Sequence, residues 1–218
     1  MNSTFELYGA PTGNCLRAAI ALEEADLPYT PKLVDLASFE HQGADHLALN
    51  PLGKVPVLVE REDGREPFVL TQSTAIMLYA AGKGAGRLLP DYEPHRAIVL
   101  ERLFFFVTDV IAVNHAAFSL RDSNAQEAQK ILMDRMLATL ETAERYVARD
   151  EFIAGAAFSL ADIAAYTITR SVMSDLPWSK LPNLRRWVEA IDRRPAVRRG
   201  LEVFERIYDP EVVSRLAM

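Results

Sequence analysis

Every strand-like pattern in this sequence lies before Pro90, and this limits the possible folds more than any other feature. Apolar runs bounded by turn-forming residues, as strands are, occur at 5–8, 29–36, 55–60 and 67–70. Helical patterns occupy 15–24 and 72–81. The polar turn at Asp63-Gly64 predicts a hairpin between the last two strands. The first two strands are predicted to be parallel, because a helix separates them.

After Pro90 only helical periodicity remains. It covers five segments, 94–120, 124–149, 159–174, 183–193 and 196–206. We therefore predict an α/β domain over 1–81, a glycine-containing linker over 82–92 and an all-helical bundle over 93–218.

The bulk properties argue against several classes of partner. A formal net charge of -6 disfavours nucleic acid, whose binding proteins usually carry a basic face. No basic stretch followed by an apolar core opens the chain, and no apolar run approaches the roughly 18 residues of a membrane span, so we expect a cytoplasmic protein. With one cysteine, Cys15, and four histidines too far apart for a ligand pair at helical spacing, we expect no metal site.

The loop before the first predicted helix has the chemistry of an anion site. Backbone N–H groups and the positive end of a helix favour a bound anion. Thr12 adds a hydroxyl donor and Asn14 an amide donor, which suits a thiolate. Lowering a thiol pKa by one unit takes about 1.4 kcal/mol, within the range of about 1.5 to 3 kcal/mol for one charged hydrogen bond. Thr and Asn are also common turn and N-cap residues, and both roles stay open.

Four motifs, in order, resemble those of cytosolic glutathione transferases over nearly the whole chain. They are NPLGKVPVL at 50–58, TQSTAI at 71–76, FIAGAAFSLAD at 152–162, and the segment 182–197. The resemblance implies a thioredoxin-like, glutathione-binding first domain, in which the proline at position 56 is cis. It also implies glutathione as cosubstrate, a role in detoxification, and a homodimer with helices 72–81 and 94–120 at the contact.

The loop Ala10-Pro11-Thr12-Gly13-Asn14 is similar to the APTPN loop of bacterial nu-class enzymes, and more loosely to the SPN loop of phi-class enzymes. The chain as a whole resembles nu-class members most, with phi- or theta-like membership as the alternative. Gly13 replaces the usual proline. The similarity implies that Thr12 and Asn14 face the glutathione sulfur and activate its thiolate for attack on a small hydrophobic electrophile or a disulfide. Disulfide reduction is expected to be measurable and conjugation to an aryl halide weak.

The remaining atoms of glutathione also have candidate partners. Gln72 and Ser73, at a predicted helix start, can bind the γ-glutamyl carboxylate, and helix capping is their alternative or concurrent role. By similarity to the family, the Val55 backbone pairs with the cysteinyl amide, and Lys54 and His41 bind the glycine carboxylate. A solvated surface role stays open for Lys54, and the role of His41 stays open too.

Other conspicuous residues are expected to be structural. Cys15 stands where the second cysteine of a redox Cys-x-x-Cys would be, but the first position holds Thr12, so packing is the favoured role. Tyr8 is interpreted as a strand residue. Ser159 and Asp162 form the pattern of a capping box. Weaker candidates for the second substrate are Asp109, Val113 and His115.

A different class of function is a non-catalytic binding or assembly module with the same fold. Such a module has no need to keep Thr12, Asn14, Gln72 and Ser73 together, so their presence favours an enzyme.

Overall fold

The computed structural model describes residues 3–84 and 88–205, which form two compact units. One unit combines 3–84 with 194–205, and the other consists of 88–193. The predicted division into 1–81, 82–92 and 93–218 stays a prediction. Part of it, at residues 85–87 and 206–218, lies outside the described residues.

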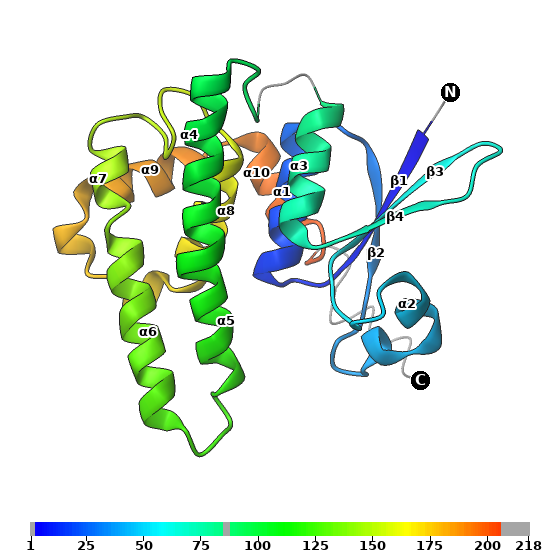
Figure 1. The fold of residues 1–218 in the computed structure, drawn as a ribbon, viewed down its shortest axis with the longest axis horizontal. Coiled ribbons are helices and arrows are strands. Elements are labelled where there is room, and N and C mark those ends of the chain that lie inside the picture. Colours follow the sequence, from blue (N-terminus) through cyan, green and yellow to red (C-terminus); the bar gives the residue numbers. More distant parts are fainter. Residues whose placement is uncertain (1–2, 85–87, 206–218) are drawn as a thin grey trace. The chain divides into compact units, whose positions relative to one another are not determined.

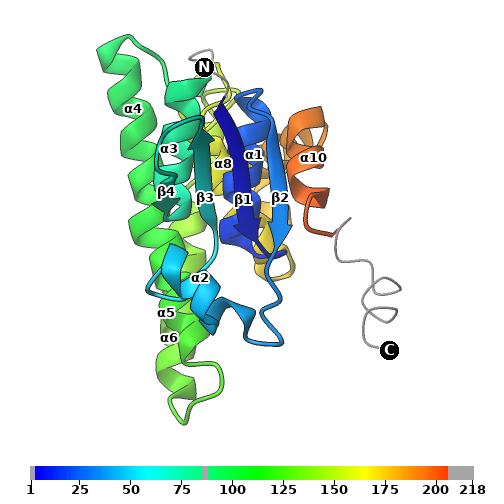
Figure 2. The ribbon, with the colours of Figure 1, turned by 90° about the vertical axis from the view of Figure 1, so that its right-hand side faces the viewer.

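The first unit contains a four-stranded mixed sheet with the order β2-β1-β3-β4 (Figures 1 and 2). The strands are β1 (Ser3–Gly9), β2 (Tyr29–Leu33), β3 (Val57–Glu62) and β4 (Phe68–Thr71). Strand β1 runs parallel to β2 and antiparallel to β3, with Leu7 opposite both Pro31 and Leu58. Strands β3 and β4 pair antiparallel. The predicted parallel pair and hairpin are therefore both confirmed.

Helices α1 (Gly13–Glu24) and α3 (Ser73–Lys83) lie on one face of this sheet (Figure 2). Helix α1 is buried around nearly its whole circumference from residue 17 to residue 22, because it also packs against α3 and α10 (Pro195–Glu202). A Cβ atom at Gly200 would lie 2.7 Å from the Ile20 side chain, so glycine permits this close helix contact. The pattern over 196–206 predicts a helix of the bundle, but α10 packs in the first unit; Arg206 lies outside the described residues.

Between β2 and β3 the chain forms two short helices that no sequence pattern predicts. They are the 3-10 turn η1 (Glu40–Gln42) and α2 (Ala44–Leu49). The Val55–Pro56 peptide bond that follows is cis, as the family resemblance implied.

The second unit is helical, as predicted. It contains α4 (Glu93–Phe104), the π-helical segment η2 (Phe105–Ile111), α5 (Ala112–Ser119), α6 (Gln126–Glu141), α7 (Glu144–Val147), α8 (Leu160–Ser171), the 3-10 turns η3 (Met173–Asp175) and η4 (Trp178–Lys180), and α9 (Pro182–Asp192). The predicted helix 94–120 is thus interrupted by π-helical hydrogen bonding, and the predicted helix 124–149 is divided in two. Helix α8 is the centre of the core, since every residue from Leu160 to Thr169 is buried.

The predicted capping box at the start of α8 is present. The Asp162 Oδ2 atom accepts hydrogen bonds from the backbone N–H and the hydroxyl of Ser159, each at 2.9 Å. The Oδ1 atom accepts from the Ile153 N–H and from Trp187 Nε1, also at 2.9 Å each. Burial raises the pKa of Asp162 to about 6 despite these donors, which act in the opposite direction. This carboxylate is therefore a folding element.

Candidate functional site

The loop between β1 and α1 places Thr12 at the N-cap position of α1, where its carbonyl accepts the Leu16 N–H at 2.9 Å. The Thr12 side chain does not cap the helix. Its hydroxyl instead donates to Cys15 Sγ at 3.1 Å. Because the hydroxyl can rotate, it can donate its single hydrogen to an acceptor at the loop surface instead of to Cys15.

Cys15 is fully buried, and burial raises the pKa of its thiol. Its Cβ lies beside Gly9, where an added Cβ would meet the Phe204 ring at 2.5 Å. Phe204 is itself fully buried and follows α10. The base of the Thr12 loop is thus packed by a residue from the far end of the described chain. This environment matches the packing role expected for Cys15.

Arg17 joins two of the predicted site residues, and the sequence analysis missed it. Its Nη1 atom donates to Asn14 Oδ1 at 2.6 Å and to Ser73 Oγ at 3.1 Å. The Arg17 side chain is only 3% exposed, and burial lowers its pKa to about 10. The starts of α1 and α3 are therefore connected through one buried cation. An arginine inside a helix ordinarily faces solvent, so no sequence pattern indicated this burial.

Gln72 adopts an unusual backbone conformation immediately before α3. Its φ of 70° lies in the left-handed region, which costs a non-glycine residue about 1 to 3 kcal/mol and is concentrated at functional sites. The Gln72 side chain is exposed and does not cap α3, whereas Ser73 is buried.

The other three predicted ligands lie on the segment between β2 and β3. His41 Nδ1 is buried and has no hydrogen-bond partner within the described residues. Lys54 is exposed, and its carbonyl accepts from His46 Nε2 at 3.1 Å and Asn50 Nδ2 at 2.7 Å. Val55 precedes β3, whose ladder begins at Val57. The roles of His41, Lys54 and Val55 stay predictions.

The secondary candidates divide between the two units. The Tyr8 hydroxyl donates to Glu6 Oε2 at 3.4 Å, in agreement with a strand role. In the second unit, Asp109 is exposed and accepts the Thr108 hydroxyl at 2.8 Å. Val113 is half-buried and His115 is exposed, both on α5.

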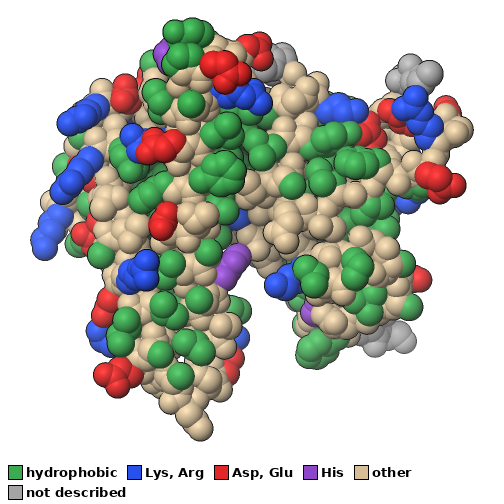
Figure 3. Space-filling view, in the orientation of Figure 1, with side chains coloured by type: hydrophobic (Ala, Val, Ile, Leu, Met, Phe, Trp, Pro, Cys, Tyr) green, Lys and Arg blue, Asp and Glu red, His purple; other side chains and the backbone are tan. Residues whose placement is uncertain are grey.

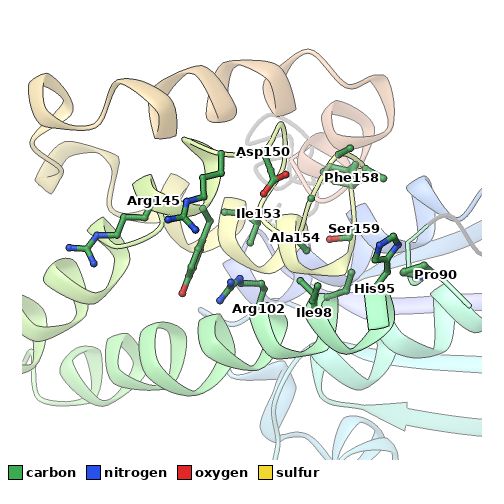
Figure 4. Close-up of a pocket in the computed structure, with 16 residues that line it drawn as sticks. Pro90, His95, Ile98, Arg102, Arg145, Asp150, Ile153, Ala154, Phe158 and Ser159 are labelled. Carbon is green, nitrogen blue, oxygen red and sulfur yellow. The ribbon is translucent and has the colours of Figure 1, made fainter. Parts of the chain in front are cut away.

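A cavity of about 760 Å³ lies within the second unit, between α4, α7 and the loop that leads to α8 (Figure 4). Ile98, Ile153 and Phe158 form apolar walls, and Arg102 and Arg145 add positive charge. None of the predicted site residues lines this cavity. No sequence motif predicts this cavity, because the residues that line it are scattered from 90 to 159.

Two absences hold for residues 3–84 and 88–205. In these ranges no group of three or more His, Cys, Asp or Glu side chains converges in a way that could hold a metal ion. None of the helices within them has the length and apolar character needed to cross a membrane.

Comparison with known proteins gives the same family for both halves of the chain. The family model for the glutathione S-transferase N-terminal domain matches residues 3–82, and that for the C-terminal domain matches residues 105–195. Glutathione S-transferase GstB of Escherichia coli K12 is 29% identical over 197 residues, which are 85% of this chain and 91% of the relative. Disulfide-bond oxidoreductase YfcG of the same strain is 30% identical over 206 residues, which are 90% and 94% of the two chains.

A solved structure agrees with these matches. A glutathione transferase family member from Pseudomonas fluorescens Pf-5, crystallised with two glutathione molecules, superimposes with a TM-score of 0.82 at 25% identity. The match covers 91% of this chain and 92% of the other.

Proposed function

The chain belongs to the glutathione S-transferase family, and on that premise we propose that it is a glutathione transferase that activates the glutathione thiol for attack on an electrophile or a disulfide. The observation that carries this proposal is the connection of Asn14 to Ser73 through Arg17. It brings together the loop expected to face the sulfur and the helix start expected to bind the γ-glutamyl carboxylate.

In the proposed mechanism, Thr12 and Asn14 donate hydrogen bonds to the sulfur and lower the thiol pKa from about 8.5 toward neutrality. Ser73 and the N-terminus of α3 hold the γ-glutamyl carboxylate. The Val55 backbone pairs with the cysteinyl amide. His41 and Lys54 bind the glycine carboxylate, and the buried Nδ1 of His41, which has no hydrogen-bond partner among the described residues, supports that role.

The attacking sulfur in this mechanism belongs to glutathione. A hydroxyl at position 12 cannot form a mixed disulfide, and Cys15 is buried with a raised thiol pKa. With an electrophile, the thiolate forms a C–S bond and the leaving group departs with its electron pair. With a disulfide, the thiolate forms an S–S bond and expels one sulfur as a thiolate. A second glutathione then resolves the mixed disulfide and glutathione disulfide is released.

We propose that disulfide reduction is the stronger of the two activities. The similarity of the Thr12 loop to nu-class enzymes supports this choice, and YfcG is named a disulfide-bond oxidoreductase. Retention on glutathione-agarose, followed by parallel assays with a mixed disulfide and an aryl halide, tests the proposal. Retention with no activity in either assay would favour a binding module, and failure of both retention and activity would refute glutathione dependence.

We also propose a homodimer. Exposed apolar side chains occur on β4, at Phe68 and Val69, and on α4, at Ile98 and Phe104, and Figure 3 shows apolar side chains dispersed over the surface of each unit. Light scattering is expected to give twice the chain mass, and a value near 24.3 kDa at micromolar concentration would contradict the dimer.

From the family we further propose a cytoplasmic location and a detoxification role. Cell fractionation would test the location, and survival of a deletion strain under electrophile challenge would test the role.

A further inference from the structure

One atom of Arg17 forms hydrogen bonds with the side chains of two residues of the proposed site, Asn14 and Ser73. The Nη1 nitrogen carries two hydrogens, and it donates to Asn14 Oδ1 at 2.6 Å and to Ser73 Oγ at 3.1 Å. An arginine side chain has only donors, so both partners must accept. This one-sided chemistry determines how each partner can be oriented.

At Asn14 the contact decides the direction of the amide. If the amide were reversed, two donors would face each other at hydrogen-bond distance. Asn14 Oδ1 therefore stays on Arg17, and the Nδ2 hydrogens are presented elsewhere. A thiolate accepts hydrogen bonds and donates none, so it needs this amide orientation.

At Ser73 the same reasoning applies to the hydroxyl. Arg17 occupies one acceptor position of Ser73 Oγ, so the hydroxyl hydrogen points away from the guanidinium. A carboxylate likewise only accepts. The Ser73 O–H is thus available as a donor, and bonding to a cation on its other side strengthens it.

We propose that Arg17 is a positioning residue of the glutathione site, holding the Asn14 amide as a donor to the sulfur and the Ser73 hydroxyl as a donor to the γ-glutamyl carboxylate. The inference rests on the proposed function. Arg17 stays protonated at neutral pH, because burial lowers its pKa only to about 10. One buried cation then links thiol activation to recognition of the distant end of the same peptide.

The test is to replace Arg17 and measure two properties of bound glutathione. Arg17→Met is expected to raise the pKa of the bound thiol by about one unit, read from thiolate absorbance, and to weaken binding about tenfold or more. Arg17→Lys keeps a donor and a charge, and is expected to give intermediate values. A simple cross-link between α1 and α3 would change the melting temperature but leave the thiol pKa unchanged.

Arg194→Met is the matched control. Arg194 forms two 2.7 Å contacts with the Glu24 carboxylate at the other end of α1, so its loss also removes an arginine bound to this helix. It is expected to lower stability without moving the thiol pKa. If Arg17→Met folds with a normal thiol pKa and normal affinity, the inference is wrong.

If Arg17→Met does not fold, Asn14→Asp still tests whether the direction of the Asn14 amide affects the thiol pKa. The aspartate keeps an acceptor for Arg17 but removes the Nδ2 donor, so we expect a preserved melting temperature and a raised thiol pKa. An unchanged thiol pKa in this variant would also overturn the inference. Wild-type protein that fails to bind glutathione would refute the proposed function itself, before any variant is compared.

Discussion

Each unit of the molecule contains a buried charged side chain near the start of a helix, and the two serve different ends. Asp162 in α8 accepts four hydrogen bonds, all from groups of its own unit. Arg17 in α1 donates to Asn14 and Ser73, each of which keeps a further donor. Bonds to Asp162 therefore fix the fold, whereas bonds from Arg17 orient groups that can bind a ligand.

Burial acts on the two charges in opposite directions for the same physical reason. Desolvation disfavours the ionised form, so it raises the pKa of Asp162 and lowers the pKa of Arg17. The comparison shows that burial and a shifted pKa do not by themselves mark a functional residue. A better indication of function is whether the hydrogen-bonding partners of the buried charge keep a donor that can bind a ligand.

Asp162→Ala is expected to have the largest effect. Removing the carboxylate leaves four donors without their acceptor, so we expect unfolding to become easier by about 3 to 5 kcal/mol. Denaturant titration measures this loss, and calorimetry on the remaining folded protein should show normal glutathione affinity. Ser159→Ala removes only one donor and is expected to cost about 1 kcal/mol. An Asp162→Ala protein with normal stability but no glutathione affinity would contradict the assignment of Asp162 to folding.

The stability lost in Asp162→Ala is expected to depend on pH. The pKa of Asp162 is raised from an ordinary 3.8 to about 6 in the folded protein, so its proton-linked stabilisation is complete below pH 3.8 and is lost as pH rises through 6. The stability gap between wild type and Asp162→Ala is therefore expected to be larger at pH 4 than at pH 7, by up to about 3 kcal/mol. Paired denaturant titrations at both pH values measure it. A gap that narrows in acid would mean that the four hydrogen bonds outweigh desolvation.

Ser73→Ala tests the other side of the comparison. Loss of a hydrogen bond to a charged group is expected to weaken glutathione binding by about 1 to 3 kcal/mol, as titration calorimetry would show. Ser171→Ala is the control, since that hydroxyl donates to the Ile168 carbonyl within α8. Equal affinities for the two variants would count against a carboxylate site at Ser73.

Thr12→Ala and Asn14→Ala are expected to have the smallest effects. Each should raise the bound thiol pKa by about one unit and reduce turnover at neutral pH accordingly. Cys15→Ala, at the neighbouring buried position, should retain most activity. A Cys15→Ala protein that folds and binds glutathione but is inactive would restore a redox role for this cysteine.

Local sequence patterns were sufficient to predict the sheet, most helices and the capping box. They failed where structure depends on distant partners. Helix α2 has only six residues and follows Gly43, so its periodicity is too short to recognise. The π-helical hydrogen bonds of η2 leave the apolar pattern of 94–120 unchanged. Trp187 lies 25 residues from Asp162, so no local pattern connects them.

The site was predicted unevenly for the same reason. Residues in loops and at helix starts, such as Thr12 and Ser73, stand out because their backbone neighbours suggest anion binding. Arg17 lies inside a helix, where an arginine ordinarily faces solvent. Only the burial of α1 on every side shows that it must be enclosed.

The position of α10 has a consequence for biosynthesis. A ribosome releases the sheet and α1 first, then the whole of 88–193, and only afterwards α10 and Phe204, which cover α1 and Gly9. Domains generally fold as units while the chain emerges. Here synthesis of the thioredoxin-like unit starts first, but the helical unit is the first to have all its residues. The packing beneath the Thr12 loop is therefore complete only after α10 and Phe204 have been synthesised.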